Sequence, residues 1–179
     1  MRIGVITESE GESRVAIVPS SIRKLAKSGY EVAIQEGAGK LSNYSDQDYS
    51  DAGAKVVDRE EALKSPFLIC VRFPEGVDFF EGQVIACIAD PFRHPERIKF
   101  CNSRKATLLS MDMIPRRLSR AQSMDVNSSQ DNLAGYKAVL LGASMVPKGI
   151  PMMTTSAGTI RPAKVVIMGS GVAGLQAIA

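Results

Sequence analysis

The chain has 179 residues, of which 45% are hydrophobic and 23% are charged, and its formal net charge is +3. This size and composition are typical of a soluble globular protein with one large domain, or with one domain and part of another. The excess of 22 basic over 19 acidic residues is too small to indicate a nucleic-acid-binding protein, and no run approaches the ~20 apolar residues of a membrane helix.

Short apolar runs alternate with amphipathic segments through the first 111 residues. Nearly continuous apolar runs are typical of strands buried in a parallel sheet, and they predict strands at 2–6, 31–35, 54–57, 67–71, 84–88 and 106–111. Start signals at Pro19 or Ser20, Ser45 and Pro95 predict helices at 19–29, 45–53 and 95–103. The alternation predicts a three-layer α/β domain with a mostly parallel sheet, of the Rossmann or flavodoxin-like type.

Three cysteines are present, and no two of them have the CxxC spacing of a redox or metal motif. Cys70 and Cys87 lie inside the apolar runs FLICV and VIACI. We therefore expect buried, reduced thiols rather than disulfides, in a reducing compartment.

Residues 115–127 fit neither a helix nor a strand. Polar side chains crowd there among small residues: Arg116, Arg117, Arg120, Gln122 and Asp125. A helix is predicted to follow at 128–147, where Ser128 and Asp131 resemble a capping box. This helix is apolar around much of its girth, so we expect it to be packed between two bodies of structure. Residues 148–163 are rich in Pro, Gly and Thr and are predicted to be a linker.

A glycine motif lies near the end of the sequence. The run KVVIM predicts a strand at 164–168, GSGVAG follows at 169–174, and a helix is predicted to begin there. In the GxGxxG pattern Gly169 allows a tight turn, Gly171 lets the backbone approach a pyrophosphate, and Gly174 allows close packing of the helix. Residues 164–179 therefore predict the first strand, turn and helix of a truncated Rossmann domain, after an α/β domain at 1–127.

Two segments carry a resemblance to a known family. PRRLSRAQSMDVNSSQDNLAGYKAV and PMMTTSAGTIRPAKVVIMGSGVAGLQAIA resemble the NAD-binding alpha subunit of proton-translocating NAD(P) transhydrogenases. The N-terminal ITESEGESRVAIVPSSIRKLAKSGYEVAIQEGAG is similar to the wider family that also contains alanine dehydrogenase. The resemblance covers the whole chain.

The resemblance implies a function that composition and spacing do not give. Such a subunit binds NAD(H) in the cleft between two α/β domains and passes hydride directly to NADP(H) held by a partner subunit. A membrane domain couples this transfer to proton movement. The resemblance thus implies a homodimer on the inner face of the cell membrane, or the matrix side in mitochondria, with no membrane insertion by this chain and no nucleic-acid partner. We expect the 179 residues alone to be inactive.

The resemblance also implies site residues. Arg117, Gln122 and Asp125 correspond to the residues that fix the nicotinamide and ribose, with Ser128 close behind. Gln122 and Asp125 would act by positioning, since direct hydride transfer needs no protein acid or base. The glycine turn would hold the cofactor through Gly169, Gly171, Val172 and Gly174, and no metal site is expected. The family has one arginine after the proline, whereas Arg116 and Arg117 both follow Pro115; counting back from Gln122 selects Arg117.

Two alternatives remain open at this point. An alanine dehydrogenase-like enzyme would use the counterpart of Arg14 to pair with a substrate carboxylate, but its lysine and histidine positions fall near Arg72 and Asp90, and the single histidine is His94. An arginine stays protonated near neutral pH and cannot act as the base, so Arg14 is expected to pair with Glu8 or Glu12. The second alternative is a non-catalytic, truncated dimerisation module.

Overall fold

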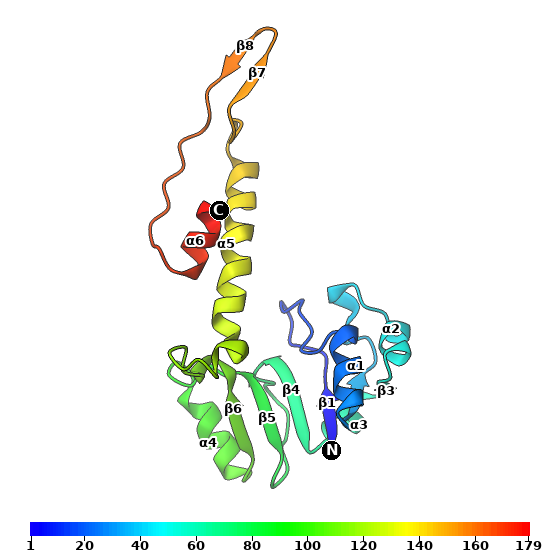
Figure 1. Ribbon diagram of the computed structural model, residues 1–179. Coiled ribbons are helices and arrows are strands. Elements are labelled where there is room, and N and C mark those ends of the chain that lie inside the picture. The colour runs from blue at the N-terminus through cyan, green and yellow to red at the C-terminus, as the bar shows by residue number, and fades with distance from the viewer. The chain divides into compact units, whose positions relative to one another are not determined.

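A computed structural model describes residues 1–179 and divides into two compact units, unit 1 at residues 1–114 and unit 2 at residues 115–179 (Figure 1). The loop at 115–125 and the helix after it therefore belong to one unit. None of the helices combines the length and the hydropathy that a membrane crossing requires.

Unit 1 is built on a six-stranded sheet in which every pair is parallel. The strands, in chain order, are β1 (Arg2–Val5), β2 (Glu31–Gln35), β3 (Lys55–Val57), β4 (Phe67–Arg72), β5 (Val84–Ile88) and β6 (Thr107–Ser110). Their order in the sheet is β3-β2-β1-β4-β5-β6. The predicted parallel α/β fold is confirmed. The chain runs outward from β1 to one edge and then from β4 to the other, so the carboxyl ends of β1 and β4 form a topological switch point.

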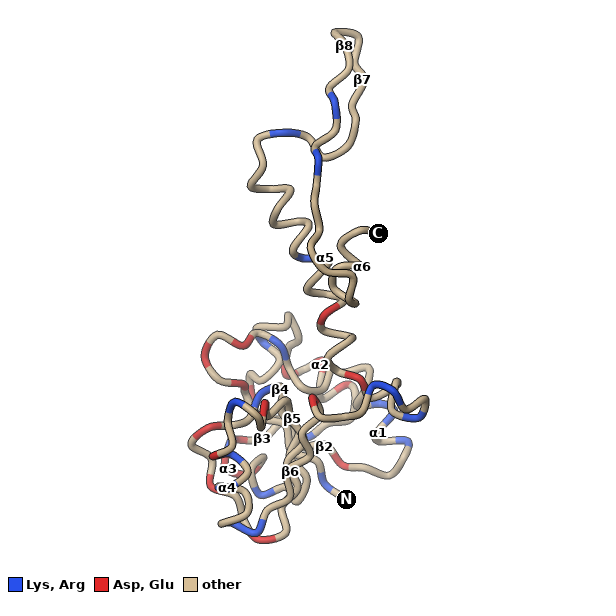
Figure 2. Tube along the Cα trace, turned by 90° about the vertical axis from the view of Figure 1, so that its left-hand side faces the viewer, with Lys and Arg blue, Asp and Glu red and all other residues tan.

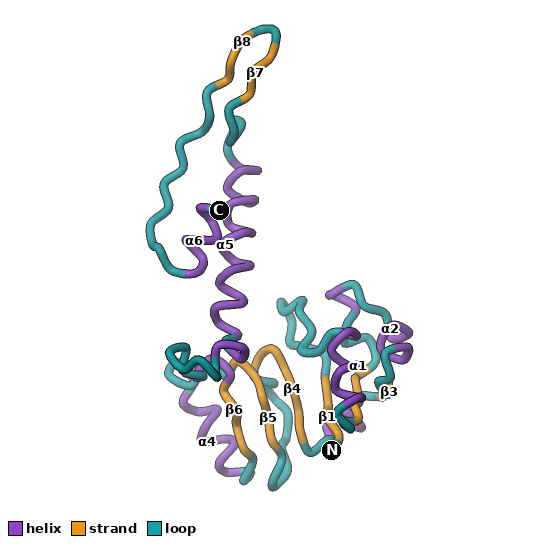
Figure 3. Tube along the Cα trace, in the orientation of Figure 1, coloured by secondary structure: helices purple, strands orange, loops and turns teal.

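Helices cover both faces of this sheet (Figure 3). They are α1 (Pro19–Lys27), α2 (Asp46–Asp51), α3 (Arg59–Leu63) and α4 (Pro95–Ser103), with short 3₁₀ turns η1 (Lys40–Ser42) and η2 (Met111–Met113). The predicted start signals are confirmed: Pro19 and Pro95 lie in the first turns of α1 and α4, and Ser45 forms a capping box with Asp48 at α2. Asp58 caps α3 by accepting a hydrogen bond from the Glu61 amide at 2.8 Å.

The core of unit 1 forms two clusters, because successive side chains of a strand point to opposite faces of the sheet. Ile3 and Val5 of β1 pack in the cluster that contains residues of α1 and α2, and Leu68 and Cys70 of β4 pack in the cluster that contains residues of α3 and α4. All three cysteines are free and buried, as predicted, and burial raises the pKa of each thiol.

Tyr49 is the largest fully buried side chain of unit 1, and its hydroxyl donates a hydrogen bond of 2.9 Å to the Ile17 carbonyl oxygen. We expect Tyr49→Phe to lower the free energy of unfolding by about 1–2 kcal/mol, because it leaves that buried carbonyl oxygen unpaired. Burial raises the pKa of Tyr49 from 10 to about 12. The stability linked to the neutral hydroxyl is therefore complete below pH 10 and is lost as pH rises towards 12. Urea denaturation at pH 8, 10 and 11.5 measures both effects; an equally steep loss above pH 10 in the phenylalanine variant would contradict the assignment.

Unit 2 contains η3 (Gln122–Met124), the long helix α5 (Val126–Met145), the antiparallel hairpin of β7 (Met153–Thr155) and β8 (Gly158–Ile160), and α6 (Val172–Ile178). The hairpin lies within the segment predicted to be a linker. The β-branched side chains of Thr154, Thr155 and Thr159 favour strands, and Gly158 takes φ +132° beside a two-residue turn. The helix predicted after the glycine motif is confirmed.

Two predictions for unit 2 are wrong. Residues 164–168 form no strand, because no neighbouring strand is present to accept their backbone hydrogen bonds. The long helix begins at Val126 rather than Ser128, and the pair Ser128–Asp131 is not its cap. Asp125 is the N-cap instead, and Ser128 occupies the third helical position.

Candidate functional site

The polar loop at the start of unit 2 is a series of tight turns. Backbone hydrogen bonds run from the Leu118 amide to Pro115 O (3.3 Å), from the Ala121 amide to Leu118 O (2.8 Å), and from the Met124 amide to Ala121 O (2.9 Å). Ala121 is buried, whereas Gln122 is exposed at the first position of η3. The Gln122 side-chain amide has no hydrogen-bond partner in the chain, so both its donors and its acceptor are available to a ligand.

Asp125 joins this loop to α5. Its carboxylate accepts hydrogen bonds from the Ser128 amide (2.9 Å) and from the Ser128 hydroxyl (2.6 Å). These bonds, helped by the charge of Arg116, hold the pKa of Asp125 below its usual range. Asp125 and Ser128, two of the predicted cofactor-binding residues, are thus brought together, but their mutual contact is a helix cap.

The two adjacent arginines differ in their surroundings. Arg116 forms long ion pairs with Asp125 (3.7 Å) and with Asp131 (3.8 Å), which tie the loop to the first turn and a half of α5. Arg117 is exposed and forms no ion pair or hydrogen bond within the chain. Of the two guanidinium groups, that of Arg117 is the one free to meet an anion or a carbonyl oxygen.

The glycine turn has the backbone geometry that its motif predicts. Gly169 takes φ +113°, a conformation that side chains other than glycine rarely adopt. A Cβ on Gly174 would collide with the Gly169 carbonyl oxygen and lie 2.9 Å from its carbon atom, so the first and third glycines pack on one another. Gly171 is the N-cap of α6, Val172 is its first residue, and a Cβ on Gly171 would meet nothing within 4 Å. The space beside Gly171 is thus open.

A further glycine, which the sequence did not single out, positions this turn. Gly135 is buried in the middle of α5, and a Cβ there would collide with the Ala173 carbonyl oxygen and lie 2.9 Å from the Ala173 Cα. The first turn of α6 therefore packs directly on the backbone of α5. A glycine inside a strongly predicted helix is the available signal for such a close approach.

The loop residues and the glycine turn are not in contact with each other. Asp125 begins α5, and the glycine turn packs near Gly135, ten residues later, which corresponds to about 15 Å along the helix axis. Both sets lie in unit 2, with α5 as their common support (Figure 1).

Unit 1 carries a separate polar cluster at its switch point. Arg14 donates to Glu12 through Nε (2.7 Å) and Nη2 (2.5 Å), and Nε of Arg72, at the end of β4, approaches the same carboxylate at 3.3 Å. The hydrogen bonds from Arg14 lower the pKa of Glu12 to about 2. The expectation that Arg14 pairs with a nearby carboxylate is therefore confirmed, with Glu12 as the partner.

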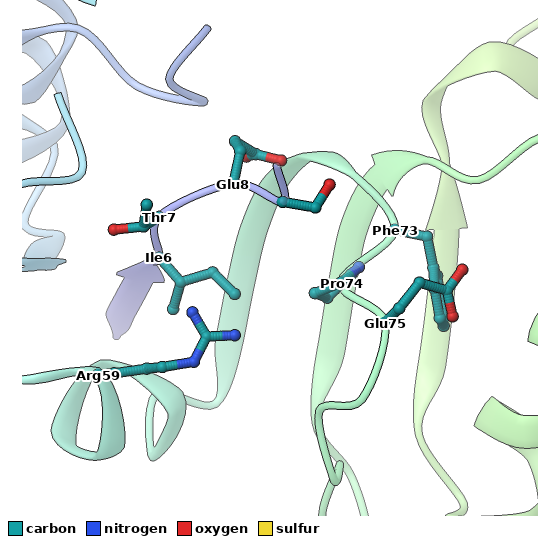
Figure 4. A pocket seen from close by; sticks show the side chains of 8 residues that line it. Ile6, Thr7, Glu8, Arg59, Phe73, Pro74 and Glu75 are labelled. Atoms are coloured by element: carbon teal, nitrogen blue, oxygen red, sulfur yellow. The ribbon is translucent and has the colours of Figure 1, made fainter. Parts of the chain in front are cut away.

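A small pocket of about 100 Å³ lies beside the turn that follows β1 (Figure 4). Its polar lining includes Thr7, Glu8, Arg59 and Glu75. The Glu8 carboxylate accepts hydrogen bonds from the amides of Val71 (2.6 Å) and Arg72 (3.0 Å), yet burial outweighs these bonds and raises the pKa of Glu8. Glu8 thus fixes the loop after β1 to the end of β4.

Neither Asp90 nor His94 forms a catalytic pair. Asp90 takes φ +44°, its amide donates to the Asp112 carboxylate at 3.0 Å, and its own carboxylate lies 3.7 Å from Arg93. His94 is partly exposed and contacts Glu96 at 2.9 Å. These contacts are those of a loop between β5 and α4.

Comparisons with known proteins agree with this geometry. The family described as "Alanine dehydrogenase/PNT, N-terminal domain" matches residues 4–134, and "Alanine dehydrogenase/PNT, C-terminal domain" matches residues 138–179. The chain is 41% identical, over its full length, to an NAD(P) transhydrogenase alpha subunit of Rhodospirillum rubrum. It superposes over 99% of its length on the crystal structure of a transhydrogenase from Sinorhizobium meliloti, with a TM-score of 0.94 and 41% identity.

A solved L-alanine dehydrogenase is more distant, with a TM-score of 0.85 and 27% identity over 99% of the chain. The chain spans about half the length of these relatives: 49% of the Rhodospirillum rubrum subunit, 52% of the Sinorhizobium meliloti chain and 51% of the alanine dehydrogenase chain.

Proposed function

Since the chain belongs to the alanine dehydrogenase/PNT family and is a homologue of transhydrogenase alpha subunits, we propose that it is the NAD(H)-binding part of a proton-translocating NAD(P) transhydrogenase. In the complete assembly NADH reduces NADP⁺ on a partner subunit, and a membrane domain couples the transfer to proton movement. The assembly would contain a homodimer of this chain at the inner face of the cell membrane. The observation that carries the proposal is the polar loop 115–125, in which Arg117 and Gln122 have free polar groups.

The residues of unit 2 fit a dinucleotide. The open space beside Gly171 suits a pyrophosphate, for which a Cβ at this position would be an obstacle. Bound NAD(H) would supply the hydride, which passes between two rings held close together and needs no protein acid or base. Arg117 and Gln122 would hold the nicotinamide carboxamide and ribose, Asp125 and Ser128 would fix the end of the loop, and Gly169, Gly171, Val172 and Gly174 would hold the phosphates.

Arg117, rather than Arg116, is assigned to the nicotinamide end. Arg116 lies within ion-pair distance of Asp125 and Asp131, so its role is to hold the loop on α5. The amino-acid-oxidising alternative has less support, because the Arg14 guanidinium is already paired with Glu12 and neither Arg72 nor Asp90 replaces the expected lysine and histidine.

Titration of the 179-residue chain with NADH, followed by fluorescence or calorimetry, tests the proposal. We expect saturable binding that Gln122→Ala and Gly171→Val each weaken by roughly ten-fold or more, equivalent to about 1.4 kcal/mol. Gly171 has φ −76° and free space at its Cβ, so the valine variant should fold normally and lose only ligand contact. Asp125→Asn keeps a capping oxygen and separates the carboxylate's charge from its capping role.

Gly142→Ala is the matched control, because a Cβ at this position in α5 also meets nothing within 4 Å. Binding that survives Gly171→Val unchanged would rule out the glycine turn as the phosphate site. Absence of binding up to millimolar NADH would mean that these residues bind the cofactor only together with the further half that the relatives contain.

A further inference from the structure

Unit 2 exposes an unusual amount of apolar side chain. Only Gly135 of α5 is fully buried, and α6 is the helix that packs on it. We call the following exposed residues the apolar surface of unit 2: Leu133, Tyr136, Leu140, Leu141, Met145, Val165, Val166, Met168, Leu175 and Ile178. Val166 and Met168 are 85% and 95% exposed, values normal for lysine rather than for valine or methionine.

The size of this surface exceeds what an isolated monomer normally shows. Its exposed area is on the order of 1,000 Å², above the roughly 300–600 Å² of the largest apolar patch on a typical monomer and similar to the ~800 Å² that each partner buries in a stable interface. Charge is sparse in this region, and the tube through α5, the hairpin and α6 is almost uncoloured in Figure 2. The charged residues after Asp125 are Asp131, Lys137, Lys148, Arg161 and Lys164.

The backbone of residues 164–168 adds a second, independent feature. The run KVVIM forms no ladder, although Val165, Val166 and Ile167 are strong strand formers. Consecutive apolar side chains, rather than alternating ones, are typical of a strand that is covered on both faces and paired on both sides in a parallel sheet. The partner that fits this surface must therefore supply strands beside 164–168 and apolar side chains against α5 and α6.

We propose that the apolar surface of unit 2 docks the polypeptide that supplies the remaining strands of the alanine dehydrogenase/PNT C-terminal domain. The match to that domain covers residues 138–179, and the solved Sinorhizobium meliloti chain, which superposes on 99% of this chain, devotes only 52% of its own length to the match. A second copy of this chain fits less well, because it brings another unpaired KVVIM run without the sheet that would flank it. The inference concerns assembly and does not rest on NAD(H) binding.

Mixing experiments test the docking surface. The probe is the segment of the Sinorhizobium meliloti transhydrogenase chain that lies C-terminal to the matched region, produced as a separate polypeptide and added to the 179-residue protein. Analytical ultracentrifugation should show a 1:1 complex, and amide hydrogen exchange at 164–168 should slow by about 100-fold once these amides enter a ladder. Val166→Pro removes a ladder donor and Leu140→Glu places a charge on the apolar surface, so each should weaken the complex at least ten-fold.

Asn132→Glu is the matched control, since it adds the same charge at an exposed polar position of α5. It should leave the affinity within about two-fold, a change of ~0.4 kcal/mol. The proposal is overturned if no 1:1 complex forms, or if Val166→Pro and Leu140→Glu bind as tightly as the unmodified chain. It is also overturned if the protein alone forms a dimer that protects 164–168, because the surface then accepts a second copy.

Discussion

Gly4→Ala should unfold unit 1 at a temperature roughly 10 °C lower than the unmodified protein, a loss of about 3 kcal/mol at the upper end of overpacking effects. Gly4 lies in β1, the central strand that pairs with both β2 and β4. A Cβ at this position would collide with the Ala62 carbonyl oxygen and lie 2.9 Å from both Cβ and Oγ of Ser65. The obstacle is backbone at the end of α3, so no side-chain rotation relieves it.

Differential scanning calorimetry, together with urea denaturation, measures the loss. Gly142→Ala provides the control, because it is the same chemical change at a position with free space. A second variant, Gly4→Ala with Ser65→Gly, removes the contact with Ser65 but keeps the collision with Ala62, so it should recover only part of the stability. An unchanged unfolding temperature in Gly4→Ala would mean that α3 does not pack on β1 as described.

Gly135→Ala should detach α6 from α5 while leaving unit 1 unaffected. The new methyl group requires the first turn of α6 to move away by about 1 Å, since carbon atoms pack at roughly 3.5–4.0 Å and the Ala173 Cα lies 2.9 Å from the added Cβ position. Alanine also improves helix propensity by about 1 kcal/mol, so α5 itself should become more stable. The expected result is faster exchange in α6 combined with slower exchange in α5.

Hydrogen exchange measured by mass spectrometry separates these two effects. Peptides covering 172–178 should exchange about ten-fold faster in Gly135→Ala, whereas Gly142→Ala should stabilise α5 without this change, because its Cβ meets nothing. If both variants leave α6 equally protected, the contact between Gly135 and Ala173 does not determine the position of the glycine turn.

The sequence predicts most of unit 1 because its signals there are local and agree with one another. Ser45 and Asp48 form the capping box at the predicted place, and the six apolar runs all become parallel strands. At α5 two local signals compete: Ser128 with Asp131 has the spacing of a capping box, but Asp125 is the residue whose carboxylate reaches the Ser128 amide. Spacing alone does not decide between them, because the outcome depends on how the preceding turns deliver the chain.

The features that the sequence does not predict depend on distant partners. Residues 164–168 have the composition of a strand but no neighbour to pair with, and strand structure exists only in pairs. Gly135 is notable only once α6 lies against it. For the candidate site, the sequence identified Arg117, Gln122 and Asp125 through resemblance, whereas the separate role of Arg116 follows from its position near Asp125 and Asp131.

The three buried thiols give unit 1 a built-in chemical clock. Cys70, Cys87 and Cys101 all lie in one core cluster of the sheet domain, and unit 2 contains no cysteine. Because burial raises their pKa values, these groups remain unreactive thiols until the core opens. The rate at which a disulfide reagent modifies the protein therefore records the opening of unit 1 alone, so the lifetime of the sheet can be followed separately from any event in α5, the hairpin or α6.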